Sequence, residues 1–389
     1  MPLLWVILHF VAAGLLMALV NWLGLRAWRR AAAEHWTERA RRLWPVRYTA
    51  GINILLLPAS LALLHAGWAP EDTSWVVANG VAGLLGAVLG CYPLERAMFP
   101  TLDFPTWARQ FAALPGLRLG LVFLFFMAMV FMPDEDGGGM VLIAGGYLAL
   151  TLLVLFGGFF RYLRLIGYLE PAGPRLQQIV ADSAVRMQVG VRNTWQARGV
   201  LANAFASPTT KELIFTNRLL ELCTDEEVAV ICAHELAHLT ESKMVLAGRL
   251  LGALVFFPLL FMHPAVHSLG QTGLLVPLAG LVLMLIFVRR LSQRMEKRAD
   301  ALAAQEQTNE GVYARALEKL YEANQTPAVN VNNRQTHPHL YDRMVAAGVT
   351  PDYPRPARPR KLTWAGWVVV LVFVVLPWTI WVFTMTVNS

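Results

Sequence analysis

The chain has 389 residues, of which 56% are hydrophobic and 15% are charged, and its formal net charge is +7. Soluble domains carry about a quarter charged residues, so this composition excludes a chain made only of soluble domains and places much of its surface in lipid. The basic residues cluster in short segments between apolar runs, as in the cytoplasmic loops of membrane proteins, and do not predict binding to nucleic acid.

Eight apolar runs are long enough to cross a bilayer, which takes about 20 residues of helix. The first run is too long for the apolar part of a cleavable signal peptide, and its positive charge follows the run rather than preceding it. We therefore expect a multi-pass α-helical membrane protein with about eight transmembrane helices. The runs cover approximately residues 3–25, 49–67, 75–92, 117–132, 140–160, 245–262, 270–288 and 364–386, and the fourth is the shortest.

The loops between these runs alternate in charge. Lys and Arg gather in every second loop, whereas residues 69–74, 133–139 and 263–271 contain neither. Basic loops lie on the cytoplasmic side, so we expect both termini outside and the polar regions in the cytoplasm. Arg249, near the start of the sixth run, is expected to snorkel to the cytoplasmic surface. The Arg- and Ala-rich composition favours a bacterial inner membrane.

Two stretches, 161–243 and 289–362, are too polar for lipid and too long for loops. Together they suffice for one small α+β domain. A transmembrane hairpin at 244–288 is predicted to interrupt this domain. A five-helix transmembrane region at 1–160 precedes it, and a last transmembrane helix at 363–389 follows it.

Within the polar domain the pattern predicts three kinds of element. An amphipathic helix covers 174–190, and short strands cover 203–207 and 212–217. A further helix starts at a capping box, T-x-x-E, formed by Thr224 and Glu227.

This further helix carries "CAHELAHLTE", residues 232–241. His234 and His238 lie one turn apart on one helix face, so they can bind a single ion. Glu235 lies about 100° round the helix from His234, where a base is needed beside a metal. The alternative is a set of interfacial polar residues, because H-E-x-x-H also arises by chance. Glu241 is poorly directed for a third ligand.

A catalytic zinc takes a third protein ligand and leaves one position open. The stretch "MEKRAD", residues 295–300, places Glu296 and Asp300 four residues apart on a predicted helix. One carboxylate can bind the metal while the other holds a ligand histidine through its second ring nitrogen. The alternative is a solvated charged face that pairs with neighbouring Arg or Lys.

These motifs resemble those of the membrane-embedded gluzincin peptidases, the family of the CAAX prenyl proteases and the HtpX-like peptidases. "HELAH" is followed, after the hairpin, by E-x-x-x-D, and two further segments match: "NAFA" at 203–206 and "HPHLYDR" at 337–343. The resemblance covers roughly 174–345. Five runs precede the first motif, as in the CAAX proteases, but no motif ties this region to prenylated substrates, so the substrate class does not carry over.

The resemblance implies a zincin-type metallopeptidase with one Zn²⁺ per chain. Its metal ligands would be His234, His238 and Glu296. It makes Glu235 the catalytic base, supports Asp300 as the partner of a ligand histidine, and places His337 and Arg343 near the site.

Two further groups have a physical role in such a site. His337 or Arg343 offers a positioned donor for the oxyanion of a tetrahedral intermediate. His339 competes for this role, unless it is a surface histidine. The segment "NAFA" would pair with an extended substrate as an edge strand, or serve as a plain sheet strand; its residues are Asn203, Ala204, Phe205 and Ala206.

The sequence therefore predicts a membrane-integrated zinc endopeptidase that acts on membrane-anchored or membrane-adjacent polypeptides, in quality control or maturation. The expected partners are a polypeptide substrate and the lipid bilayer, without nucleic acid. Two alternatives stay open: a transporter or channel, and a non-catalytic scaffold of the same fold. The spans are nearly free of charge and show no paired repeats, which disfavours transport.

Overall fold

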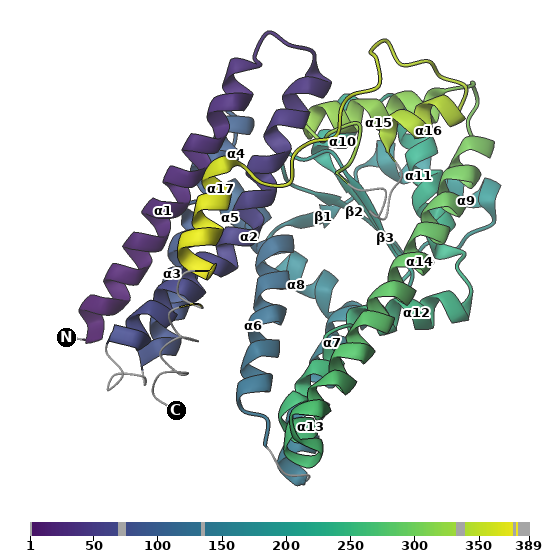
Figure 1. Cartoon of the computed structure of the whole chain (residues 1–389). Coiled ribbons are helices and arrows are strands. Elements are labelled where there is room, and N and C mark those ends of the chain that lie inside the picture. Colours follow the sequence, from purple (N-terminus) through teal and green to yellow (C-terminus); the bar gives the residue numbers. More distant parts are fainter. Residues whose placement is uncertain (1, 69–74, 134–136, 332–338, 376–378, 380–389) are drawn as a thin grey trace.

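The computed structural model describes residues 2–68, 75–133, 137–331, 339–375 and 379. Over these ranges the chain is mostly helical, with one small four-stranded sheet. In Figure 1 the long helices extend to one end of the molecule, while the sheet and a group of shorter helices gather at the other. A helical membrane region and a small α+β domain are therefore both present.

Five helical segments of the described chain are long and apolar enough to cross a membrane, as expected for an integral membrane protein. The fourth predicted run, although the shortest in sequence, belongs to a helical segment of 27 residues. The runs at 49–67 and 245–262 have no segment of their own among the five, and the run at 364–386 lies partly outside the described residues, so the count of eight stays a prediction. The five segments are Leu3–Arg30, Val76–Met98, Phe104–Val130, Gly138–Leu165 and Phe257–Gln305.

We call the first five helices the N-terminal bundle. Of its two short members, α4 packs against α1 and α5 packs against α4, and α17 (Trp364–Val370), near the other end of the chain, also packs against α1 and α2 (Figure 1). The backbone N–H of Thr363 donates to Thr49 Oγ1 at 3.3 Å, which holds the start of α17 on α2. The bundle consists of α1 (Pro2–Arg30), α2 (Trp36–Trp68), α3 (Val76–Leu89), α4 (Tyr92–Met98) and α5 (Phe104–Phe111).

Glycines let α1 and α3 approach each other closely. A Cβ at Gly86 would lie 2.0 Å from the carbonyl oxygen of Phe10, and a Cβ at Gly90 would lie 2.6 Å from that of Gly14. Both obstacles are backbone atoms, which cannot move aside as a side chain can. Small residues at such crossings are what allow membrane helices to gain packing contacts.

Replacement of Gly86 by valine is expected to destabilise the bundle. Overpacking typically costs about 1–3 kcal/mol, and here two helices would have to separate. Thermal unfolding in detergent should therefore show a lower Tm. Gly80→Val on the same helix is the matched control, since a Cβ there meets nothing within 4 Å. Equal Tm values for the two variants would contradict close helix packing at Gly86.

Two kinked helical segments follow the bundle. A π-helical turn at 112–116 joins α5 to α6 (Leu117–Val130). A second irregular turn, with Gly157 at φ +116°, joins α7 (Gly138–Leu153) to α8 (Phe159–Leu165). The end of α8 leads directly into the sheet.

The predicted hairpin has one broken arm. The run at 245–262 is not one helix, because α12 (Lys243–Ala253) ends early and a 3₁₀ turn with Pro258 follows it. The return helix α14 (Leu275–Gln305) is continuous for 31 residues and runs past the predicted boundary at 288. The two arms are antiparallel, since Gly248 lies against Leu291 and Gly280 against Pro258. Between them lie α13 (Met262–Leu269) and a second 3₁₀ turn (Gly270–Leu274).

The sheet has the strand order β1-β2-β4-β3. Strands β2 and β4 are parallel and the other two pairs are antiparallel. The predicted strands at 203–207 and 212–217 are confirmed as β3 and β4, whereas the pattern missed the other two. The strands are β1 (Leu169–Pro171), β2 (Asn193–Ala197), β3 (Ala204–Ser207) and β4 (Glu212–Thr216).

The two faces of the sheet pack against different partners. Leu213 and Phe215 contribute to the core shared with the domain helices, while Ile214 faces a cluster that contains Phe160 of α8. The sheet is thus held between the domain helices and the end of a predicted transmembrane helix. The domain helices are α9 (Pro174–Met187), α10 (Asn217–Leu222), α11 (Asp225–Leu239), α15 (Val312–Ala323) and α16 (Leu340–Ala346).

Candidate metal site

Helix α11 positions the two histidines of the first motif. Its start is fixed by the predicted capping box: Thr224 Oγ1 accepts from the N–H of Glu227, and the Glu227 carboxylate accepts from the N–H of Thr224. His234 and His238 then lie one turn apart on this helix, and each is only 8% exposed. The helix is therefore a buried, capped support for both imidazoles.

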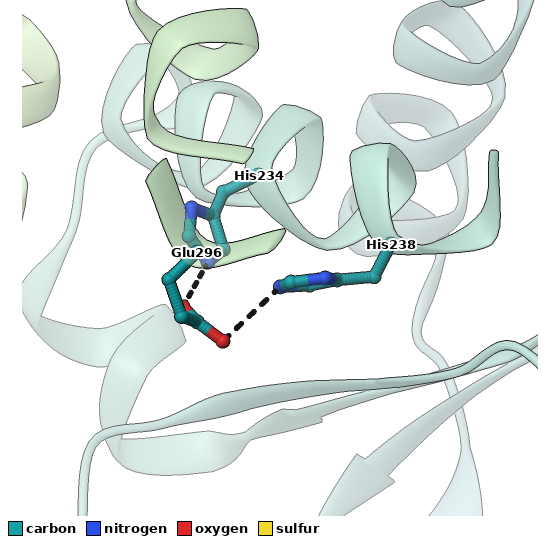
Figure 2. Close-up of side chains that lie close together, drawn as sticks. All are labelled: His234, His238 and Glu296. Atoms are coloured by element: carbon teal, nitrogen blue, oxygen red, sulfur yellow. Dashed lines mark ion pairs between the residues drawn. The ribbon is translucent and has the colours of Figure 1, made fainter. Parts of the chain in front are cut away.

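Glu296 of α14 completes a three-residue cluster. Its carboxylate oxygens lie 3.6 Å from His234 Nε2 and 3.8 Å from His238 Nε2. One donor atom from each residue lies within 4.8 Å of the others, and all three residues are buried. Figure 2 shows the three side chains converging from two helices.

The donor set fits zinc. Two imidazole nitrogens and one carboxylate oxygen are a common zinc set, with metal–ligand distances of about 2.0–2.2 Å. In a tetrahedral site such ligands stand about 3.4 Å apart, close to the two separations from Glu296.

Arg298 fixes the register of α14 on α11, because its guanidinium donates to Ala237 O at 3.1 Å and to Thr240 Oγ1 at 2.7 Å.

A second layer of polar groups orients His234. Its Nδ1 lies 2.8 Å from the Tyr313 hydroxyl and 3.2 Å from Asp300 Oδ1. Tyr313 donates to Asp300 at 2.8 Å, and Arg343 donates to Asp300 and to the Tyr313 oxygen. Asp300 therefore lies beside a histidine rather than among the three converging donors, a choice that the motif alone had left open. Tyr313 was not predicted.

The neighbouring carboxylates act on the acid–base behaviour of His234. Burial lowers the pKa of its imidazole, but hydrogen bonds to Asp300 and Glu296 outweigh burial and raise this pKa to about 9. The two carboxylates thus make the site favourable for positive charge.

His238 has a similar support. Its Nδ1 lies 2.9 Å from Glu241 Oε1, and the Glu241 carboxylate also accepts two hydrogen bonds from Arg249. The Glu241 side chain is 1% exposed. Glu241 lies three residues after His238, a spacing that does not direct its carboxylate to a shared metal but does allow it to contact the second ring nitrogen of His238. Arg249, whose side chain is 36% exposed, pairs with this buried carboxylate, and its expected position at the cytoplasmic surface stays a prediction.

Glu235 lies at the wall of a cavity of about 230 Å³ beside the three-residue cluster. The same cavity is lined by His234, Tyr313 and Arg343, and by residues at the start of β3. A proton acceptor therefore faces space beside the cluster, as the helix geometry predicted.

The three candidate residues of the segment 337–343 lie in different places. His337 falls outside the described residues, so its predicted role is untested. Arg343 lies in the site, with a side chain that is 9% exposed. His339 is 5% exposed and its Nδ1 accepts from the N–H of Asn330, so the interpretation of it as a surface histidine was wrong. It stands at the start of α16 and is not among the residues that line the cavity.

The segment "NAFA" forms the edge of the sheet next to α11. Asn203 and Ala204 line the cavity, and Ala206 belongs to the domain core. Phe205 instead points to the opposite face, where its ring lies 6.2 Å from that of Phe159. Only the first half of the segment therefore borders the site.

Two histidines converge from one helix with a glutamate from a second helix, beside an edge strand, which is the arrangement expected of a zincin-type metallopeptidase domain. Residues 172–348 match the model of Peptidase family M48. The match agrees closely with the range inferred from the motifs.

The chain is similar to protease HtpX of Legionella pneumophila (strain Lens), with 29% identity over 182 residues, 42% of this chain and 64% of that protein. It is also similar to a protease HtpX homolog of Trichormus variabilis, with 26% identity over 184 residues, 42% of this chain and 62% of that protein. The chain thus spans slightly less than two thirds of the length of these curated relatives.

Replacement of Tyr313 by phenylalanine is expected to weaken zinc binding by about 10–100-fold, the usual effect of losing a group that orients a ligand histidine. The ring would stay and only the hydroxyl between His234, Asp300 and Arg343 would be lost. Competition with a chromophoric chelator measures the affinity. Tyr341→Phe on α16 is the matched control, and equal affinities for both variants would exclude this role for the hydroxyl.

Proposed function

We propose that this protein is a zinc-dependent endopeptidase integral to a membrane. One observation carries the proposal: His234, His238 and Glu296 converge on one point, and Glu235 lines the cavity beside them. Zinc held by these three side chains supplies Lewis acidity at the carbonyl of a scissile peptide bond.

Glu235 is the proposed general base. It accepts a proton from the attacking water and passes it to the leaving amine, and a positioned carboxylate in this role contributes about 10²–10⁴-fold to the rate. The buried partners of the histidines, Asp300 and Glu241, keep the imidazoles oriented while this proton moves.

Arg343 is the proposed donor to the oxyanion. Its Nη2 is committed to Asp300 and Tyr313, whereas its Nε is buried and has no hydrogen-bond partner within the described part of the chain. Arg343 lines the cavity, and its positive charge there would stabilise negative charge that develops on the substrate carbonyl. His337 stays a second candidate for this role.

The free edge of β3 is the proposed site for the substrate backbone. Substrates bound there in extended form would add a strand to the sheet next to Glu235. Because the domain joins predicted transmembrane helices through α8, α12 and α14, we infer that substrates are membrane-anchored or membrane-adjacent polypeptides. The positive-inside charge pattern supports eight spans with both termini outside and a cytoplasmic site. The Arg- and Ala-rich composition supports a bacterial inner membrane.

The test uses the purified full chain in detergent. It should bind about one zinc, cleave an unstructured polypeptide such as casein, lose activity with a chelator and regain it with zinc. A chain without bound zinc, or chelator-resistant cleavage, would contradict the proposal. Absence of cleavage with zinc bound would favour the scaffold alternative.

A further inference from the structure

The free edge of β3 is not open along its whole length. The N–H of Thr216 in β4 donates to Asn203 O at 2.9 Å, so the backbone groups of Asn203 face β4. Neighbouring residues of a strand direct their backbone groups to opposite edges, so those of Ala202, Ala204 and Ala206 face away from β4. These three residues mark the edge that an added strand would use.

The side chain of Asn324 already occupies this edge at Ala202. Its Oδ1 accepts from the Ala202 N–H at 2.8 Å, and its Nδ2 donates to the Ala202 carbonyl at 2.7 Å. A single amide thus makes the same two hydrogen bonds that a paired strand residue would make. Ala202 is fully buried, and both residues line the cavity beside Glu235.

Helix α15 connects this contact to the metal site. Tyr313 near its start bonds to His234, and Asn324 lies at its C-terminal end. The N–H of Asn324 donates to Leu320 O at 3.0 Å, and that of Thr326 donates to Tyr321 O at 2.8 Å, so the helix end is closed by regular backbone hydrogen bonds. The distance between cluster and edge is therefore set by one rigid helix.

The N-terminal bundle holds this helix end from the other side. Arg47 of α2 donates to Asn324 O at 2.9 Å, which places a cation at the negative end of the α15 dipole. At the next residue, Trp28 of α1 donates to Gln325 Oε1 at 2.9 Å. In α5, Gln110 accepts from the N–H of Val200, in the loop before β3, at 3.1 Å.

We propose that Asn324 is a positioning residue that closes the substrate edge at Ala202 and so sets the register of a bound polypeptide, and that Arg47 keeps it there. A substrate backbone can then pair with Ala204 and Ala206 but cannot extend to Ala202. This limits how far the polypeptide can slide past the metal. The proposal rests on the peptidase function, and it assigns a task to the bundle, which lies outside the matched segment 172–348.

The first experiment compares Asn324→Ala and Asn324→Asp with wild type, with casein as the probe. Asn324→Asp keeps the acceptor for the Ala202 N–H and loses the donor to its carbonyl. Asn309→Ala, at an exposed position before the same helix, is the matched control. We expect kcat/KM to fall about 10–100-fold for Asn324→Ala, since small misplacements of substrate cost up to about 10²-fold. Mass spectrometry should show cuts at additional bonds next to the wild-type ones, while zinc content stays at the wild-type level.

A second measurement does not depend on activity. Hydrogen–deuterium exchange of the segment 200–207 should speed up in Asn324→Ala and in Arg47→Met, and Arg47→Lys should restore most of the protection. Unchanged exchange in Asn324→Ala would overturn the contact. Faster exchange with unchanged cut positions and unchanged kcat/KM would overturn the register role.

Failure of the peptidase function gives a different result. In that case wild type does not cleave casein, or Glu235→Gln cleaves it equally well. The exchange measurement then still decides whether Asn324 and Arg47 hold the strand.

Discussion

Glu235→Gln is expected to lower peptide-bond hydrolysis by about 10²–10⁴-fold, the contribution of a positioned general base, while zinc binding is retained. The amide has nearly the same shape as the carboxylate but cannot accept the proton of the attacking water. Glu235 does not belong to the converging cluster of His234, His238 and Glu296, so its replacement leaves the three donors in place. Initial rates on casein, together with zinc content per chain, measure both effects.

Glu226→Gln is the matched control for this prediction. Glu226 lies in the exposed first turn of the same helix, α11. Its replacement by glutamine makes the same chemical change, from carboxylate to amide, far from the cluster. Its activity should equal that of wild type. A Glu235→Gln protein that cleaves at the wild-type rate would assign the base to another residue, and one that loses zinc would show that Glu235 supports the metal instead.

The parts of the site that follow local rules could be predicted from the sequence. The spacing of His234 and His238 fixes one helix face, and the capping box at Thr224 fixes where that helix begins. The E-x-x-x-D motif predicted that Glu296 and Asp300 share one helix face, because they lie four residues apart, but it left open which of them joins the two histidines. In each case the information lies within one turn of one helix.

Other features depend on contacts between distant segments. Tyr313 reaches His234 across 79 positions of sequence, and Arg47 reaches Asn324 across 277. The periodicity of the sequence does not encode such pairs, since each depends on how α15 packs against α11, α16 and α2. His339 was misjudged for a related reason: its burial follows from the docking of α16, which a polar residue in a loop does not reveal.

The membrane region shows a different limit of sequence reading. Hydropathy over 245–262 predicts one span, yet the chain leaves the helix after Ala253 and turns at Pro258. Average hydropathy measures whether a segment suits lipid and does not detect a break in its backbone.

Glu296→Ala is expected to weaken zinc binding by more than the 10–100-fold that follows loss of an orienting group, because a donor itself is lost. Two imidazoles cannot replace the carboxylate, and Asp300 is held away from the cluster by Tyr313 and Arg343. Chelator competition should therefore rank wild type above Tyr313→Phe, and Tyr313→Phe above Glu296→Ala.

Unfolding provides an independent measure of the same loss. A ligand that binds only the folded state stabilises it by RT ln(1 + [L]/Kd), about 2.7 kcal/mol at a hundredfold excess over Kd, so added zinc should raise the Tm of wild type and leave that of Glu296→Ala unchanged. Glu306→Ala at the end of α14 is the matched control, since that carboxylate pairs with Arg186 at 3.5 Å and takes no part in the cluster. A zinc-dependent Tm in Glu296→Ala equal to that of Glu306→Ala would remove Glu296 from the ligand set and, with it, the geometric reason for placing the metal between α11 and α14.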